Sequence, residues 1–125
     1  MRVVIVGGGA MGSSLAYWLT GPTGFAGEVV VVERDPTYAR ASSALSASSI
    51  RQQYSTSVNI RIGQFGVEFL KGADAALAVD GEAPGIFLHE NGYLFLATTA
   101  GVAVLEENHA LQKAHVARSP DLVTV

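Results

Sequence analysis

The sequence predicts an α/β fold that opens with a β-strand, an α-helix and a second strand parallel to the first. Three observations predict this order. A β-branched apolar run covers residues 3–6, an amphipathic helical pattern covers residues 10–20, and a run of four valines covers residues 29–32. Short β-branched runs are typical of parallel strands covered on both faces, and parallel strands need a crossover between them. We therefore expect a β-α-β unit at the start of the chain.

The first helix is predicted from the spacing of its apolar residues. One stripe recurs at positions i, i+4, i+7 and i+8: Met11, Leu15, Trp18 and Leu19. The segment 20–22, Thr-Gly-Pro, then forms a stop signal. Residues 3–27 carry no charge, which would suit a membrane span or a signal peptide, but seven glycines and a proline favour several short elements. We expect no membrane span here.

A second helix is predicted after the N-cap signal of residues 55–57, Ser-Thr-Ser. Its apolar stripe, which we expect to face the core rather than a cofactor, consists of Val58, Ile62, Phe65 and Phe69. Residues 72–85 are expected to form a loop with alanine-rich helical character.

A β-hairpin is predicted next, because the apolar runs 86–89 and 93–96 flank Asn91 and Gly92, a strong two-residue turn signal. An antiparallel hairpin does not belong to a parallel sheet. We therefore expect a first domain portion over residues 1–80 and an incomplete second domain over residues 81–125.

The last part of the chain predicts a helix over residues 101–117, with Glu106 and Glu107 on its solvated face. Residues 119–121, Ser-Pro-Asp, resemble the start of a further helix. The three histidines have no metal-ligand spacing, so we expect no metal site: His89, His109 and His115.

The composition argues against several classes of partner. Eight basic and eleven acidic residues give a net charge of −3, which removes most of the electrostatic attraction to nucleic acid or an anionic membrane. The absence of cysteine excludes disulfides and thiolate metal sites and is compatible with a cytoplasmic location. Hydrophobic residues make up 49% and charged residues only 15%, so apolar surface is expected to be covered by something beyond this chain.

The glycines after the first strand form a dinucleotide-binding fingerprint. Gly7 permits a tight turn, Gly9 lets the backbone approach a pyrophosphate, and Gly12 lets helix and strand pack closely. The helix start near Ala10 presents free N–H groups to the phosphates. Glu33 follows the second strand, 21 residues after Gly12, and is placed to accept hydrogen bonds from a ribose. This fingerprint is shared by nicotinamide and flavin dinucleotides, and composition does not separate them.

Longer segments resemble the N-terminal region of the D-amino-acid oxidase superfamily of FAD-dependent oxidoreductases, in particular its sarcosine oxidase, dimethylglycine dehydrogenase and glycine oxidase branch. They are residues 7–19, 31–34 and 41–54. The resemblance implies a Rossmann-like FAD-binding β-α-β unit followed by the beginning of an antiparallel substrate domain. It favours FAD over NAD, with cofactor-binding residues Gly7, Gly9, Ala10, Met11, Gly12, Glu33, Arg34, Ser42, Ser43, Ser49 and Ile50.

The serine-rich segment 41–49 would by composition alone be a flexible linker. The resemblance instead implies that it passes along the pyrophosphate and the flavin. Several relatives have glycines where Ser48 and Ser49 stand, and some have a nearby histidine that links covalently to the flavin. No histidine lies near this segment, so the resemblance supports non-covalent binding of FAD by this part of the chain and leaves a covalent link from later sequence open.

The resemblance implies oxidation of an amine or amino acid by hydride transfer to flavin, with oxygen or another electron acceptor reoxidising it. In the sarcosine oxidase-like branch the arginine of this Ile-Arg pair helps to hold the substrate carboxylate, so the resemblance implies that role for Arg51. A guanidinium suits bidentate carboxylate binding, and an ordinary surface arginine is the alternative. No catalytic residue is assigned. We expect the 125 residues to be an inactive N-terminal part, completed by further sequence or a second polypeptide. A non-catalytic nucleotide-binding module and an NAD-dependent dehydrogenase domain remain alternatives.

Overall fold

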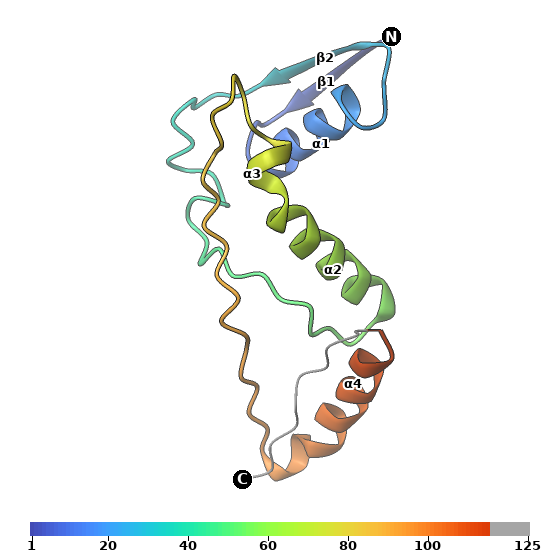
Figure 1. The fold of residues 1–125 in the computed structure, drawn as a ribbon. Coiled ribbons are helices and arrows are strands. Elements are labelled where there is room, and N and C mark those ends of the chain that lie inside the picture. The colour runs from blue at the N-terminus through green and yellow to red at the C-terminus, as the bar shows by residue number, and fades with distance from the viewer. Residues whose placement is uncertain (116–125) are drawn as a thin grey trace. The chain divides into compact units, whose positions relative to one another are not determined.

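A computed structural model gives the fold and describes residues 1–115 (Figure 1). The chain divides into two compact units, Met1–Ser49 and Ile50–Val125, and each is described by itself. The expected boundary at residue 80 separates a cofactor portion from a substrate portion, and it stays a prediction.

The first unit is the predicted β-α-β arrangement. Strand β1 (Arg2–Val6), helix α1 (Ala10–Thr20) and strand β2 (Glu28–Val32) follow one another, and the two strands pair in parallel. The register runs from Arg2 opposite Glu28 to Val6 opposite Val32, and α1 packs along the strands (Figure 1). The α/β expectation is therefore confirmed for this part of the chain.

Close packing between β1 and α1 depends on a missing side chain. Gly12 is buried in the first turn of α1, and a Cβ added to it would overlap the carbonyl oxygen of Gly7. The same Cβ would stand 3.2 Å from the Cγ2 atom of Ile5, which is the buried side chain of β1. Only glycine lets the helix begin this close to the strand.

The second unit is built from helices. They are α2 (Ser57–Lys71), the short α3 (Ala73–Ala76), the 3₁₀ turn η1 (Thr99–Gly101) and α4 (Val102–His115). Two side-chain amides form hydrogen bonds between segments of this unit. Gln64 Nε2 of α2 donates to the His115 carbonyl at the end of α4 at 2.6 Å, and buried Gln112 Nε2 of α4 donates to the Tyr54 carbonyl before α2 at 3.2 Å. The predicted helices are confirmed as far as His115, and the expected helix start at residues 119–121 lies outside the described residues.

The predicted core stripe of α2 was wrong. Val58, Ile62 and Phe65 are more than half exposed, whereas the buried side chains of this helix are Ile60 and Val67. The sequence carries two apolar stripes on α2, and spacing alone does not choose between them. The choice is made by packing, because the backbone of residues 51–52 lies against Gly63, on the face that carries Ile60 and Val67.

The predicted hairpin was also wrong for this structure. Residues 86–96 contain no strand, and the antiparallel pairing found nearby is an isolated bridge between Val79 and Glu82. Phe87, Leu94 and Leu96 are more than 80% exposed. A two-stranded hairpin is marginal in water unless another strand or a helix covers its apolar face, and nothing in the described residues does so. The beginning of an antiparallel substrate domain is therefore not seen.

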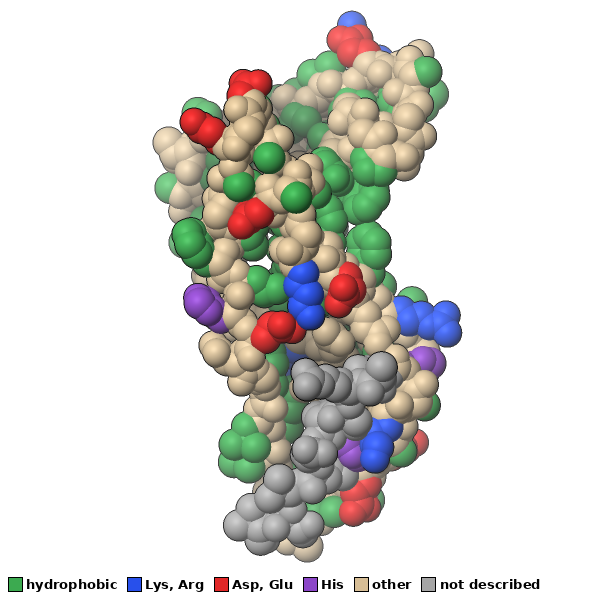
Figure 2. Space-filling view, viewed as in Figure 1, with side chains coloured by type: hydrophobic (Ala, Val, Ile, Leu, Met, Phe, Trp, Pro, Cys, Tyr) green, Lys and Arg blue, Asp and Glu red, His purple; other side chains and the backbone are tan. Residues whose placement is uncertain are grey.

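Much apolar surface stays uncovered, as the composition predicted. The buried hydrophobic residues in the described part are Ile5, Ile60, Val67 and Ala73. Hydrophobic side chains reach the surface at many places on the face in Figure 2. Within residues 1–115, no helix has the length and hydrophobicity required to cross a membrane.

Candidate dinucleotide site

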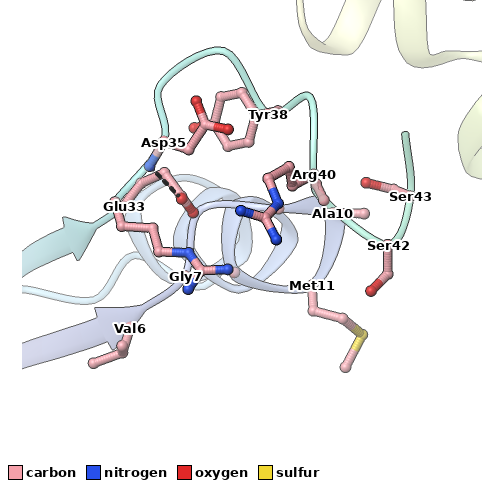
Figure 3. A pocket seen from close by; sticks show the side chains of 14 residues that line it. Val6, Gly7, Ala10, Met11, Glu33, Asp35, Tyr38, Arg40, Ser42 and Ser43 are labelled. Carbon is pink, nitrogen blue, oxygen red and sulfur yellow. Dashed lines mark hydrogen bonds between the residues drawn. The ribbon is translucent and has the colours of Figure 1, made fainter. Parts of the chain in front are cut away.

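A cavity of about 390 Å³ opens in the first unit, where β1 and β2 end and α1 begins (Figure 3). Its wall comes from the turn after β1, the first turn of α1 and the loop that follows β2. The lining residues are Val6, Gly7, Gly9, Ala10, Met11, Gly12, Glu33, Arg34, Asp35, Tyr38, Arg40, Ala41, Ser42 and Ser43. The carboxyl ends of parallel strands are where α/β folds bind ligands.

The glycines after β1 line this cavity with backbone atoms that no side chain covers. Gly7 adopts a φ of +97°, a conformation that glycine tolerates without strain, while its N–H donates to the Val32 carbonyl at 2.8 Å. Gly9 is the N-cap of α1, and no side chain caps the N–H groups that follow it. These N–H groups and the positive end of the helix dipole therefore face the cavity and suit a phosphate.

Glu33 joins the two loops of the site. Its carboxylate accepts hydrogen bonds from the Gly8 N–H at 2.7 Å and from the Asp35 N–H at 2.9 Å, one on each oxygen. The Gly8 bond first, and the Asp35 bond next, lower the pKa of Glu33 below its ordinary value of 4.5. The side chain is therefore an anion at neutral pH, and each oxygen keeps a lone pair for a further donor.

Positive charge lines the same cavity. Arg34 and Arg40 both contribute to its wall, and within residues 1–115 neither forms an ion pair with an acidic side chain. The hydroxyl-bearing Ser42 and Ser43 come from the loop opposite the glycine turn (Figure 3). Cations, hydroxyls and an open helix start are together suited to a diphosphate.

Most residues predicted for the cofactor meet at this cavity. Nine of the eleven line it; Ser49 does not, and Ile50 belongs to the second unit. Sequence reasoning missed Asp35, Tyr38 and Arg40, which also line it. A usable signal was present, because Asp-x-Thr after a strand predicts a tight turn, and such a turn brings the following residues back toward the strand end.

Arg51 belongs to the second unit, where its guanidinium lies near two aromatic rings. Its guanidinium carbon lies 5.0 Å from the centre of the Tyr54 ring and 5.9 Å from that of Phe95. The Phe95 ring in turn stacks on Tyr93, with centres 6.2 Å apart. In the described part of the chain no carboxylate pairs with Arg51, so its N–H donors remain available to an external anion. No cluster of metal-ligating side chains occurs in residues 1–115.

Comparison with known proteins agrees with the cavity. A family model described as FAD dependent oxidoreductase matches residues 2–124. The chain is 49% identical over 114 residues to FAD-dependent oxidoreductase domain-containing protein 1 of Xenopus laevis, 46% identical over 114 residues to the protein of that name in Bos taurus, and 36% identical over 117 residues to a homolog in Drosophila melanogaster. No solved structure gives a significant match.

These matches cover nearly all of this chain and a small share of each relative. They span 89% of the chain for the frog and cattle proteins and 94% for the fly homolog, but only 23%, 24% and 22% of those proteins. The chain thus corresponds to about a quarter of the length of the curated relatives it matches. The sarcosine oxidase branch suggested by the sequence is not distinguished by these matches.

Proposed function

From the premise that this chain belongs to the family of FAD-dependent oxidoreductases, we propose that the whole protein oxidises an amine or an amino acid at a carbon–nitrogen bond. The family implies FAD as the cofactor. One observation carries the cofactor part of this proposal: the uncapped start of α1 and the ionised Glu33 face one cavity, as binding of a diphosphate joined to a ribose requires.

The residues of the cavity fit the adenosine diphosphate half of FAD. Glycine at position 12 lets the helix begin against β1, so its N–H groups can reach a phosphate without a side chain between them. Glu33 is held by two backbone N–H groups and offers its remaining lone pairs to the ribose hydroxyls. Its negative charge would repel a 2′-phosphate, which disfavours NADP-type ligands. Arg34, Arg40, Ser42 and Ser43 would contact the diphosphate.

Arg51 is the residue we propose for the substrate carboxylate. Cation–π contacts use the faces of a guanidinium and leave its N–H edge free for a carboxylate. A Cβ on Gly63 would stand only 2.8 Å from the Arg51 carbonyl oxygen, so α2 supports the Arg51 backbone closely. The amine or amino acid as substrate class rests on this arginine and on the sequence resemblance.

FAD, when bound, supplies the hydride acceptor of such a reaction. The residues of this chain bind and orient, since the first unit would hold the cofactor and Arg51 would hold the acid group of the substrate. Oxygen or another electron acceptor would then complete the cycle in the whole protein.

The proposal is tested on the purified whole protein. A flavin absorption spectrum is expected as isolated, and anaerobic addition of sarcosine or dimethylglycine should bleach it. A colourless protein that binds NADH but not FAD would overturn the flavin assignment. Bound flavin that no amine or amino acid bleaches would favour a non-catalytic binding module.

Arg51 is tested separately in the same assay. Arg51→Lys should raise the KM for a carboxylate-bearing amine about tenfold or more, because a single ammonium replaces a bidentate fork. Arg61→Lys, on the exposed side of α2, is the matched control and should leave the KM unchanged. Equal KM values for all three proteins would remove Arg51 from the substrate site.

A further inference from the structure

We propose that Tyr38 is the aromatic wall on which the adenine base of FAD stacks. The inference rests on the proposed function, since it assigns a role within the same cavity. Tyr38 is the one aromatic residue among those that line this cavity. It was not among the residues that the sequence singled out.

The backbone of Tyr38 is held in a conformation that tyrosine avoids. Its φ is +55°, in the left-handed region that costs a residue with a Cβ free energy. Strained backbone of this kind persists where the surroundings fix it, and it gathers at binding sites. The strained conformation of Tyr38 is therefore consistent with a role in binding in addition to its place in the turn.

The surrounding loop does fix this conformation. The Asp35 carboxylate accepts from the Thr37 N–H at 3.0 Å and from the Thr37 hydroxyl at 2.6 Å. The Tyr38 N–H donates to the Asp35 carbonyl at 3.0 Å, and the Ala41 N–H donates to the Tyr38 carbonyl at 2.9 Å. Because Asp35 also donates its own N–H to Glu33, the loop that carries Tyr38 is tied to the carboxylate proposed for the ribose.

The ring of Tyr38 lies over the glycine turn. A Cβ added to Gly8 would stand 2.8 Å from the Tyr38 hydroxyl and 3.4 Å from its Cε1 atom, so the ring edge occupies the space that a side chain at position 8 would fill. Gly8 is also the residue whose N–H binds Glu33. Tyr38 remains 40% exposed, which leaves ring surface open to a ligand (Figure 3).

Adenine is the group of FAD that fits this surface. The base is attached to the ribose carbon that adjoins the 2′-hydroxyl carbon. Ribose hydroxyls bound by Glu33 would therefore bring the base near the Tyr38 ring, which lies by Gly8, the residue whose N–H binds Glu33. A purine is flat and stacks on aromatic side chains, whereas the diphosphate favours the N–H groups and cations elsewhere in the cavity. The flavin ring is separated from the ribose by that diphosphate and therefore lies farther away.

The test uses the apoprotein of the whole protein and measures the Kd of FAD, together with competition by ADP and by inorganic pyrophosphate. Tyr38→Leu and Tyr38→Gly should raise the Kd of FAD about tenfold, as expected for loss of one base stack. Competition by ADP should weaken to a similar degree, and competition by pyrophosphate should not change. Tyr38→Phe keeps the ring and should bind FAD within about twofold of the wild type.

Thermal unfolding of the same apoproteins separates binding from support of the fold. Glycine accepts a φ of +55° without strain, so Tyr38→Gly should unfold at the same temperature as the wild type or higher while it binds FAD more weakly. Equal ADP competition in the wild type and Tyr38→Leu would overturn the role proposed for Tyr38 but not the proposed cofactor cavity. No ADP competition in the wild type would instead overturn the proposed cofactor cavity.

Discussion

The two units differ in what determines their structure. In residues 1–49, two parallel strands and one helix are locked together by backbone features, namely a five-residue register and glycines where side chains would collide. In residues 50–115, helices pack through a few side chains, chiefly Ile60, Val67 and Gln112, and residues 86–96 contain no strand. The structure of the first unit is thus determined mainly by local backbone features, whereas that of the second depends on a few side-chain contacts. Both units leave apolar side chains exposed.

The largest expected effect concerns the close approach of β1 and α1. Gly12→Val would place side-chain atoms into the Gly7 carbonyl and against Ile5, and we expect a loss of about 3 kcal/mol or more in unfolding free energy, together with loss of FAD binding. Chemical denaturation and FAD titration of the whole protein measure both. A variant that unfolds and binds like the wild type would contradict the packing described for this unit.

A matched pair of glycines on α2 makes the corresponding test in the second unit. Gly63→Ala would place a Cβ 2.8 Å from the Arg51 carbonyl and should destabilise the protein by about 1–2 kcal/mol. Gly66→Ala meets no atom within 4 Å and should stabilise it by about 0.5 kcal/mol, because alanine favours the helix. Both values come from denaturant titration. If the two variants behave alike, α2 does not pack on residues 51–52.

Glu33 should make the stability of the first unit depend on pH. Its pKa is lowered in the folded protein, so its contribution is fully present above the ordinary value of 4.5 and is lost as the pH falls through the lower folded value. Below pH 4.5 the wild type should therefore lose thermal stability more steeply than Glu33→Gln. Parallel curves for the two proteins from pH 6 to pH 3 would show that the Gly8 and Asp35 bonds do not favour the charged form.

The smallest effect is expected at the end of α2. Lys71 Nζ lies 3.0 Å from Glu90 and 3.7 Å from Glu68, and these contacts raise the pKa of Lys71, the Glu90 hydrogen bond most. All three side chains are substantially exposed, so Glu90→Gln should lower the unfolding temperature only slightly, and 1 M salt should abolish the difference. A large, salt-independent decrease would mean that residues 86–96 are held in place mainly by this pair.

The sequence predicted the first unit well because its signals are local. Gly7, Gly9 and Gly12 each have a conformational or steric reason to be glycine, and those reasons hold wherever a strand meets a helix in this way. Glu33 was found from its spacing. Asp35 and Tyr38 were missed because a turn after β2 brings them back to the cavity, and that return depends on hydrogen bonds within the loop.

Prediction failed in the second unit where distant contacts decide the structure. α2 has two apolar stripes, and the choice of Ile60 and Val67 over Val58 and Ile62 follows from residues 51–52 packing against Gly63. The Asn91-Gly92 signal requires neighbours that would cover the flanking runs, and the described residues contain none. The contact of Arg51 with Phe95, far along the chain, was equally unpredictable from the sequence. The cytoplasmic location stays a prediction.

We propose that residues 1–49 hold the adenosine diphosphate half of FAD. The most direct measurement is competition by ADP against FAD in the apoproteins of the whole wild-type protein and of Glu33→Gln. ADP should compete with FAD in the wild type and about tenfold less well in Glu33→Gln, because the variant loses charge-assisted hydrogen bonds to the ribose. Absence of competition in the wild type, or equal competition in both proteins, would contradict the assignment of residues 1–49 to the adenosine diphosphate half of FAD.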